Sequence, residues 1–152
     1  MKIKYPTFED NRGSFTPINC KLFDREWDQF NVSLNNKKYT FRGLHYQTEP
    51  YQTKCIKVIR GKIIDILVDL KTKEVLTFKL DNTDLLLIPS NYAHGFLTLE
   101  DDTVITYLVK GEYNPTSEHS IVWNTIDEVK KIINTYTNGK DIVISEKDAL
   151  GK

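Results

Sequence analysis

Between residues 37 and 124 the chain is a succession of short apolar segments, each bounded by residues that are typical of turns. Such segments at a spacing of about ten residues favour an all-β sandwich or barrel over alternating strands and helices. With 152 residues, and with neither internal repeats nor a low-complexity linker, the chain is expected to form one domain over residues 1–152. The predicted strands are Tyr39–Leu44, Lys54–Val58, Lys62–Leu70, Thr77–Leu80, Leu85–Ile88, Gly95–Leu99, Thr103–Val109 and Ser120–Trp123.

Helical signals lie only outside this stretch. The run that begins at Thr125 has a cap-like threonine, two early acids and apolar residues at helical spacing. A turn or two is also predicted over Asp24–Gln29, and a last short turn over Ser145–Asp148. The sequence therefore predicts a small antiparallel jelly roll with a few short peripheral helices, whose edge strands a partner subunit can cover.

Charge and cysteine content limit the classes of function. Lys and Arg total 21 and Asp and Glu total 21, so bulk charge gives no reason to expect nucleic-acid binding. No apolar run reaches the roughly 18 residues that a membrane span needs, and the first residues hold no apolar signal-peptide core. Cys20 and Cys55 match neither a disulfide framework nor a paired metal spacing. We therefore expect a cytoplasmic protein with free thiols that binds neither nucleic acid nor membrane.

Two of the three histidines lie in apolar and aromatic runs at predicted strand edges. His45 is in RGLHYQ, residues 42–47, and His94 is in IPSNYAHGF, residues 88–96. An imidazole titrates near physiological pH, which suits it to accept a proton from a carbon acid. Taken singly, His45 is explained as a core residue and His94 as a strand-start residue bonded to nearby backbone. Arg42 and Lys54 near His45 favour instead an anionic, carbonyl-bearing ligand.

Strand alternation predicts which side chains share a face. Arg42 precedes His45 by three residues, so the two lie on opposite faces unless the strand bends at Gly43. Asp65 lies between apolar neighbours on its face, which suits the polar-lined mouth of a barrel. Tyr107 shares a face with apolar residues and is predicted to point into the same cavity.

Three further residues have alternative explanations. Tyr113 comes just before Asn114 and Pro115, where its ring either packs or stacks, exposed, on a planar ligand group. Asp148 is either a surface cap or a carboxylate that orients a general base, and the sequence leaves both open. His119 is predicted to lie at the surface.

These segments are part of an ordered series of motifs that spans nearly the whole chain, from Asp10 to Leu150. The motifs are DNRG at 10–13, QFNVS at 29–33, RGLHYQ at 42–47, QTK at 52–54, GKIIDILVDL at 61–70, IPSNYAHGFLTL at 88–99, NPTSE at 114–118, IVWN at 121–124 and SEKD at 145–148. The series resembles the dTDP-4-dehydrorhamnose 3,5-epimerase family, a cupin-fold group that acts on nucleotide-linked 4-keto-6-deoxy sugars. One hexapeptide is weak evidence, whereas this order of motifs is specific.

The resemblance implies roles for four catalytic residues. His45 matches the general base, Tyr107 the general acid on the opposite face of the sugar, and Asp148 the carboxylate that pairs with the base. A ketone at carbon 4 acidifies the hydrogens on carbons 3 and 5, so inversion through an enolate also needs a cation near the enolate oxygen. Lys54 fills that role, and the scheme requires no redox cofactor or metal.

The resemblance also implies a set of substrate-binding residues and a homodimer. Tyr113 matches the ring that stacks on the nucleotide base, and the Arg12 segment typically serves the neighbouring subunit's site. Pro17 departs from the pattern, because it stands where the family has a ligand-binding glutamate. The remaining ligand-contacting positions are Gln29, Asn31, Arg42, His94, Glu118 and Lys147.

Three other functions are compatible with parts of this pattern. A cupin ketoisomerase on the same substrate class would move the carbonyl between carbons 3 and 4. A non-catalytic sugar-nucleotide binding module would bind without proton exchange, although the presence of His45, Tyr107 and Asp148 argues against it. A metal-dependent cupin typically has an HxH pair, but His45 is followed by Tyr46 and Gln47, so no metal site is predicted.

Overall fold

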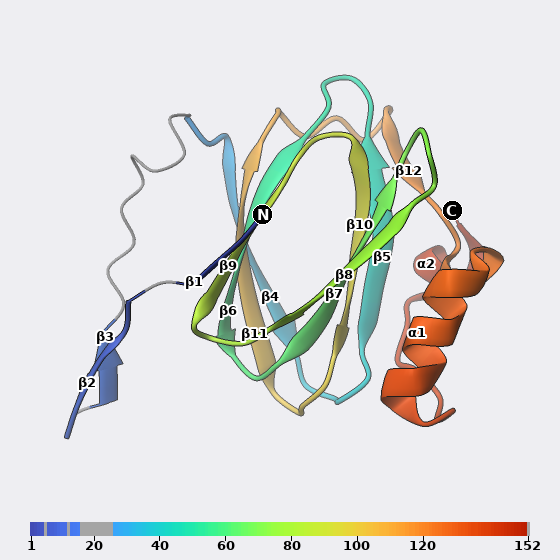
Figure 1. Ribbon diagram of the computed structural model, residues 1–152. Helices are drawn as coiled ribbons and strands as arrows, with labels where there is room; N and C mark the ends of the chain where they lie inside the picture. The colour runs from blue at the N-terminus through green and yellow to red at the C-terminus, as the bar shows by residue number, and fades with distance from the viewer. Residues whose placement is uncertain (5, 12, 16–25, 152) are drawn as a thin grey trace.

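The computed structural model describes residues 1–4, 6–11, 13–15 and 26–151, and about half of them lie in antiparallel strands (Figure 1). The strands are β1 (Lys2–Lys4), β2 (Phe8–Asp10), β3 (Gly13–Phe15), β4 (Gln29–Asn35), β5 (Phe41–Gln47), β6 (Thr53–Arg60), β7 (Ile63–Asp69), β8 (Val75–Leu80), β9 (Asp84–Ile88), β10 (Tyr92–Thr98), β11 (Thr103–Lys110) and β12 (Glu118–Ser120). The helices are α1 (Asp127–Thr137) and α2 (Glu146–Leu150), with a short 3₁₀ turn, η2 (Trp123–Thr125), before α1.

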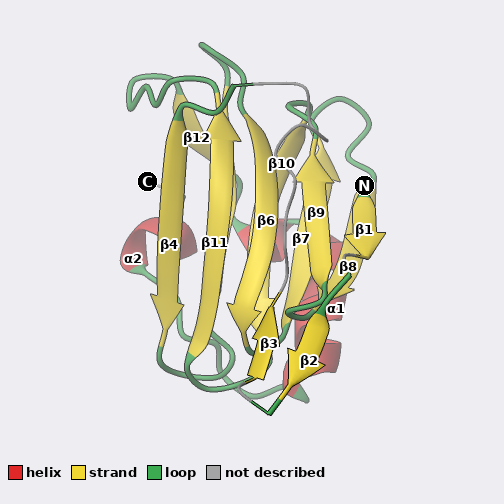
Figure 2. Ribbon diagram, turned by 90° about the vertical axis from the view of Figure 1, so that its left-hand side faces the viewer, coloured by secondary structure: helices red, strands yellow, loops and turns green. Residues whose placement is uncertain are grey.

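Two five-stranded sheets lie face to face and form the body of the molecule (Figures 1 and 2). The first sheet, broadside in Figure 2, has the order β1-β9-β6-β11-β4. The second has the order β12-β5-β10-β7-β8, and β2 pairs with β3 alone. The ladders within both sheets are antiparallel, which confirms the predicted all-β jelly-roll class.

Strand β7 shows how the core is divided between two layers. Ile63 and Leu67 pack with residues of both sheets in the space between them. Ile64, Ile66 and Val68 point the other way and pack with one face of α1. This is the alternation that the sequence predicts, and burial of one such aliphatic side chain contributes roughly 1.5–3 kcal/mol.

The two helices begin and end differently. The prediction that Thr125 caps this helix is wrong, because α1 begins after Ile126 and has no side-chain cap. The Thr125 hydroxyl donates to the Val122 carbonyl instead. Ser145 does cap α2, since its hydroxyl oxygen accepts a hydrogen bond from the Asp148 N–H. Neither helix has the length and apolar content that a membrane crossing requires in the described part of the chain.

The structure corrects the predicted elements at several places. Gln29 begins β4 and is not part of a helical turn, and residues 26–28 are not helical either, while residues 24 and 25 lie outside the described residues. The last strand is Glu118–Ser120, and Trp123 belongs to η2. Strands β1 to β4 escaped prediction, although β4 alternates apolar and polar residues throughout its length.

Candidate active site

A cavity of about 410 Å³ lies between the two sheets and takes its lining from both. The first sheet supplies residues of β4, β6 and β11, and the second supplies residues of β5 and β12. The lining residues are Gln29, Phe30, Asn31, Val32, His45, Tyr46, Gln52, Lys54, Tyr107, Val109, Tyr113 and Glu118. Seven of the twelve residues singled out from the sequence therefore meet here: Gln29, Asn31, His45, Lys54, Tyr107, Tyr113 and Glu118.

An irregularity at Gly43 decides how β5 faces the cavity. The register between β5 and β10 shifts at this point, and Gly43 has φ of +130°. A Cβ at Gly43 would lie 2.5 Å from Gly95 Cα, so only glycine lets the two strands approach this closely. As a result Arg42 turns toward the first sheet, where its Nε donates to Asn35 Oδ1 at 2.8 Å, while His45 lines the cavity. Arg42 and His45 are three residues apart, so both can lie on the same face of β5 only because the strand is irregular at Gly43.

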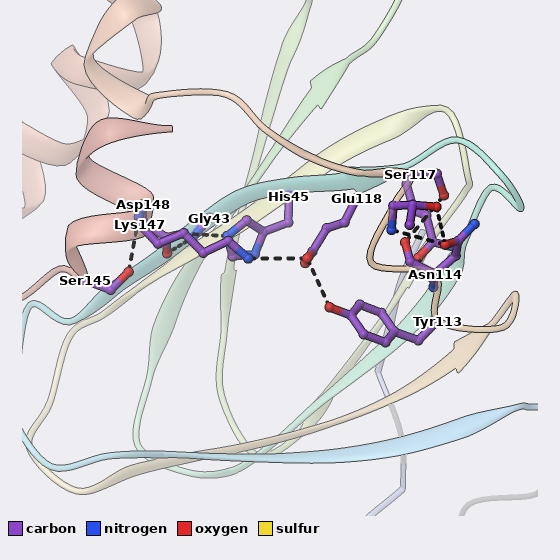
Figure 3. A network of polar contacts seen from close by, with 11 residues as sticks. Gly43, His45, Tyr113, Asn114, Ser117, Glu118, Ser145, Lys147 and Asp148 are labelled. Carbon is purple, nitrogen blue, oxygen red and sulfur yellow. Dashed lines mark hydrogen bonds and ion pairs between the residues drawn. The ribbon is translucent and has the colours of Figure 1, made fainter. Parts of the chain in front are cut away.

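His45 is held by a carboxylate from the far end of the sequence. Its Nε2 lies 2.6 Å from Asp148 Oδ1, and the Gly43 N–H donates to Asp148 Oδ2 at 3.1 Å (Figure 3). Because an ionised carboxylate only accepts, the proton between them belongs to Nε2. Nδ1 of His45 is then the unprotonated ring nitrogen that can accept a proton from a bound molecule.

The short helix α2 places this carboxylate. Ser145 caps the helix through the Asp148 N–H, which turns the Asp148 side chain toward β5 (Figure 3). Burial by itself raises the pKa of Asp148, but the hydrogen bond and charge of His45, the Gly43 N–H and the charge of Lys147 together lower it below its usual range. The carboxyl group is therefore ionised at neutral pH and can stabilise a protonated His45.

Tyr107 reaches the cavity from the opposite sheet. It pairs with Asn31 across β11 and β4, which brings the Asn31 side chain beside the phenol. Burial raises the pKa of Tyr107, although Arg42 and Asn31 act in the other direction. The phenol is therefore protonated at neutral pH and can donate its proton to a strong base such as an enolate.

Lys54 of β6 brings a positive charge to the same cavity. Desolvation lowers the pKa of Lys54, while the charges of Asp65 and Glu118 raise it. Within the described residues the ammonium group makes neither a hydrogen bond nor a direct ion pair. Its donors are therefore available to a negative charge that develops in the cavity.

At the rim, Glu118 joins two segments that are far apart in the sequence. Glu118 Oε2 accepts from the Tyr113 hydroxyl at 3.2 Å and from Lys147 Nζ at 3.3 Å (Figure 3). Tyr113 belongs to the exposed turn after β11, and Lys147 precedes Asp148 in α2. The ring of Tyr113 thus stands at the cavity mouth on a polar network that leads to the partner of His45.

A second imidazole–carboxylate pair lies behind the cavity. His94 Nε2 is 2.7 Å from Asp65 Oδ2, both side chains are buried, and neither lines the cavity. His94 is the register partner of His45 across β10 and β5. The interpretation of His94 as a residue bonded to nearby backbone is wrong, because its partner is this carboxylate; a contact with ligand stays a prediction.

Some predicted residues lie elsewhere, and some lining residues were not predicted. Arg12, Pro17 and Cys20 lie outside the described residues. Gln52 and Tyr46 line the cavity although neither was singled out. The signal for Gln52 is strand alternation, because it lies two residues before Lys54 and so shares its face.

The cavity brings together an imidazole, a phenol and an ammonium group. His45 and Tyr107 come from opposing sheets, so a flat molecule between them meets a base on one side and an acid on the other. Across the described ranges, His, Cys, Asp and Glu side chains nowhere gather in groups of three or more that could hold a metal ion. The absence of a metal requirement stays a prediction.

Comparison with known proteins places this arrangement in a protein family. The profile of the family described as dTDP-4-dehydrorhamnose 3,5-epimerase matches residues 1–152. The enzyme of that name from Shigella flexneri is 33% identical over 95% of this chain and 85% of its own length. The one from Neisseria gonorrhoeae is 34% identical over 80% of this chain, which spans only 41% of that longer protein.

Solved structures agree in fold over nearly the whole chain. The dTDP-4-dehydrorhamnose 3,5-epimerase of Bacillus anthracis, solved with TDP and PPi bound, has a TM-score of 0.85 and 32% identity, covering 99% of this chain and 91% of that one. The dTDP-6-deoxy-D-glucose-3,5-epimerase of Legionella pneumophila, solved with dTDP-4-keto-L-rhamnose, also has a TM-score of 0.85, with 28% identity and coverage of 99% and 85%.

Proposed function

The chain belongs to the dTDP-4-dehydrorhamnose 3,5-epimerase family, and we propose that it inverts carbon 3, carbon 5 or both of a nucleotide-linked 4-keto-6-deoxy sugar. Deoxysugar and surface polysaccharide biosynthesis uses such products. The observation that carries the proposal is that His45 and Tyr107 line one cavity from opposing sheets, with Lys54 beside them. The names and ligands of the relatives support a dTDP-linked substrate.

The chemistry follows from the acidity of hydrogens next to a ketone. His45 Nδ1 takes the proton from carbon 3 or carbon 5, and the electron pair of that C–H bond moves into the carbon-4 oxygen to give an enolate. Tyr107 then returns a proton to the same carbon from the other side, which inverts the centre. The imidazolium and the phenolate that remain exchange protons with solvent, and this resets the site.

Each stage has a matching electrostatic feature. Asp148, ionised at neutral pH, stabilises the imidazolium of His45, as a carboxylate does for other general bases. The Lys54 ammonium stabilises the enolate oxygen, a contribution of about 3 kcal/mol for one well-placed donor. The raised pKa of Tyr107 keeps the phenol protonated until a strong carbon base forms beside it.

The nucleotide is proposed to bind at the rim. Tyr113 offers an exposed ring for stacking on the base, and Glu118 and Lys147 stand next to it. The resemblance assigns Arg12, Gln29, Asn31, Arg42 and His94 to further ligand contacts. A nucleotide-linked sugar is charged and does not cross a lipid bilayer unaided, so we place the enzyme in the cytoplasm, where nucleotides are made.

Incubation with dTDP-4-keto-6-deoxyglucose in heavy water tests the proposal directly. We expect deuterium at carbon 3, carbon 5 or both, together with an epimerised product, both read by NMR. A carbonyl moved to carbon 3 would instead identify a ketoisomerase. Binding without any exchange would identify a binding module.

Tyr107→Phe separates the two proton transfers. The phenyl ring keeps the packing but cannot donate a proton, so we expect inversion to slow by about 10²-fold while deuterium exchange at the same carbon persists. The measurement is the ratio of exchanged to inverted product over time. Unchanged rates of both steps would remove Tyr107 from the role of acid.

We also propose a homodimer that forms over the outer face of β4. Phe30, Val32 and Leu34 alternate along this edge strand and are each more than half exposed, and the first two also border the cavity. An edge strand with such an apolar face is a surface that a second copy can cover. The implied role of the Arg12 segment in a neighbouring site supports the same assembly.

The dimer is tested by Leu34→Glu, with Tyr136→Glu on the exposed side of α1 as the matched control. We expect sedimentation velocity to show a dimer for the wild type and for the control, and a monomer for Leu34→Glu. A monomeric wild type would overturn the proposal.

A further inference from the structure

The most unusual buried group outside the cavity lining is Asp65. Its side chain is fully buried in β7, on the face that looks between the sheets. Asp65 Oδ2 is bound to His94, but among the described residues Asp65 Oδ1 has no hydrogen-bond partner. A buried carboxylate with one unmatched oxygen is costly unless a nearby positive charge compensates it.

The positive charge on which Asp65 acts is that of Lys54. Burial lowers the pKa of Lys54, and of the two negative charges that raise it, Asp65 acts more strongly than Glu118. Lys54 is on β6 of the first sheet and Asp65 on β7 of the second, so the pair acts across the interior behind the cavity. Neither residue makes a direct ion pair with the other, which leaves the ammonium donors to the cavity.

We propose that Asp65 is a positioning residue of the active site: joined to His94, it supplies the buried negative charge that keeps the Lys54 ammonium charged beside the cavity. The catalytic role of Lys54 in this inference rests on the proposed function. The electrostatic effect of Asp65 on Lys54 is independent of that function. His94 orients Asp65 through the bond to Oδ2 and so leaves Oδ1 as the oxygen without a donor.

Several other groups surround Lys54, and none replaces this charge. Glu118 is at the rim, where it is shared between Tyr113 and Lys147. On β9, the register partner of Lys54 is the apolar Ile88. The other titratable groups of the cavity lining are His45 and Tyr46 of β5, Tyr107 of β11 and Tyr113 of the turn after it, while Arg42 of β5 and His94 of β10 lie outside the lining.

The test is a titration of Lys54 in protein labelled with carbon-13 at lysine Cε, with the Lys54 signal assigned by its loss in Lys54→Arg. In Asp65→Asn the amide keeps the shape and the bond to His94 but removes the charge. We expect the Lys54 midpoint to fall by about one pH unit relative to the wild type. An unchanged midpoint would overturn the inference.

The chain offers a matched control in Asp84, a second buried carboxylate, which is paired with Lys4 and acts on Lys57. Asp84→Asn is expected to lower the midpoint of Lys57 and to leave that of Lys54 in place. If Asp84→Asn moved Lys54 as much as Asp65→Asn does, the effect would be general and the inference would fail.

Activity gives the second readout. We expect Asp65→Asn to lower kcat by about 10-fold with little change in KM, and to move the alkaline limb of the pH profile of kcat to lower pH. A merely structural Asp65 would lower the melting temperature without moving that limb. Because the NMR titration needs no turnover, it stands even if the proposed epimerase activity fails, and the two failures are distinguishable.

Discussion

Two imidazole–carboxylate pairs lie side by side on neighbouring strands of one sheet, and their surroundings give them different capacities. His45 and His94 are register partners, with Nε2-to-oxygen distances of 2.6 Å to Asp148 and 2.7 Å to Asp65. The His45 side chain is 30% exposed and lines the cavity, whereas that of His94 is 7% exposed and does not. Only His45 can therefore exchange a proton with a molecule in the cavity.

The carboxylates differ as well. Asp148 comes from a five-residue helix at the end of the described chain and accepts from both His45 and Gly43. Asp65 is part of a central strand, is fully buried and has one oxygen without a hydrogen-bond partner in the described residues. The exposed pair, His45 and Asp148, can thus act as a base and the carboxylate that orients it. The buried pair, His94 and Asp65, holds a fixed internal charge.

The largest expected effect is on the outer pair. His45→Asn removes the base, and we expect deuterium exchange into the substrate to fall by about 10³-fold while the fold persists, because this side chain is partly exposed. NMR in heavy water measures the exchange and circular dichroism the fold. His119→Asn is the matched control, since His119 is exposed on β12 and does not line the cavity. Equal deuterium exchange by the two variants would contradict the assignment of His45 as the base.

The second effect concerns stability and should be greater at the inner pair. His94→Ala leaves the buried Asp65 charge without its donor, which is expected to cost about 3 kcal/mol of the free energy of unfolding. His45→Ala is expected to cost about 1 kcal/mol, because water can reach Asp148. Urea unfolding at neutral pH compares the two. Similar losses of unfolding free energy in the two variants would show that burial does not set the two pairs apart.

The smallest effect is the pH dependence of the Asp148 contribution. The pKa of Asp148 is lower in the folded protein than its usual value of about 3.9, so the unfolded chain binds this proton first as the pH falls. The stabilisation is complete above that value and is lost as the pH falls through the lowered pKa. We expect the free energy of unfolding of the wild type to exceed that of Asp148→Asn by about 1–2 kcal/mol at pH 7. This difference should shrink below about pH 4.

Thermal unfolding of both proteins over that range measures the difference. A gap that stays constant from neutral to acid pH would contradict the assignment of an ionised Asp148.

Much of the fold and part of the site were predictable, because they depend on short-range patterns. The alternation in β7 and β11 correctly divides Ile63 from Ile64 and turns Tyr107 inward, since a strand has a period of two. Strand β4 was missed despite the same kind of pattern. The pattern showed only that Arg42 and His45 could share a face if the strand bent at Gly43, and it did not predict that the bend occurs.

The partners of the two histidines were beyond such patterns. Asp148 is 103 positions from His45, and the residues alone left it open as a surface cap or an orienting carboxylate; only the family resemblance paired the two. Asp65 is 29 positions from His94, and its face was predictable but not its bond. Residues this far apart in the sequence come into contact only because of how the strands pair and how the helix α2 packs on the sheet.

By itself, the sequence determined a mainly β chain with a phenol on an inward-facing strand position and with an imidazole and an ammonium group on strands near it. Local alternation and turn chemistry suffice for that, because both act over a few residues. Only the tertiary structure decided which imidazole meets the cavity and which is sealed behind it, since register, the bulge at Gly43 and the docking of α2 are set by packing between segments far apart in the chain.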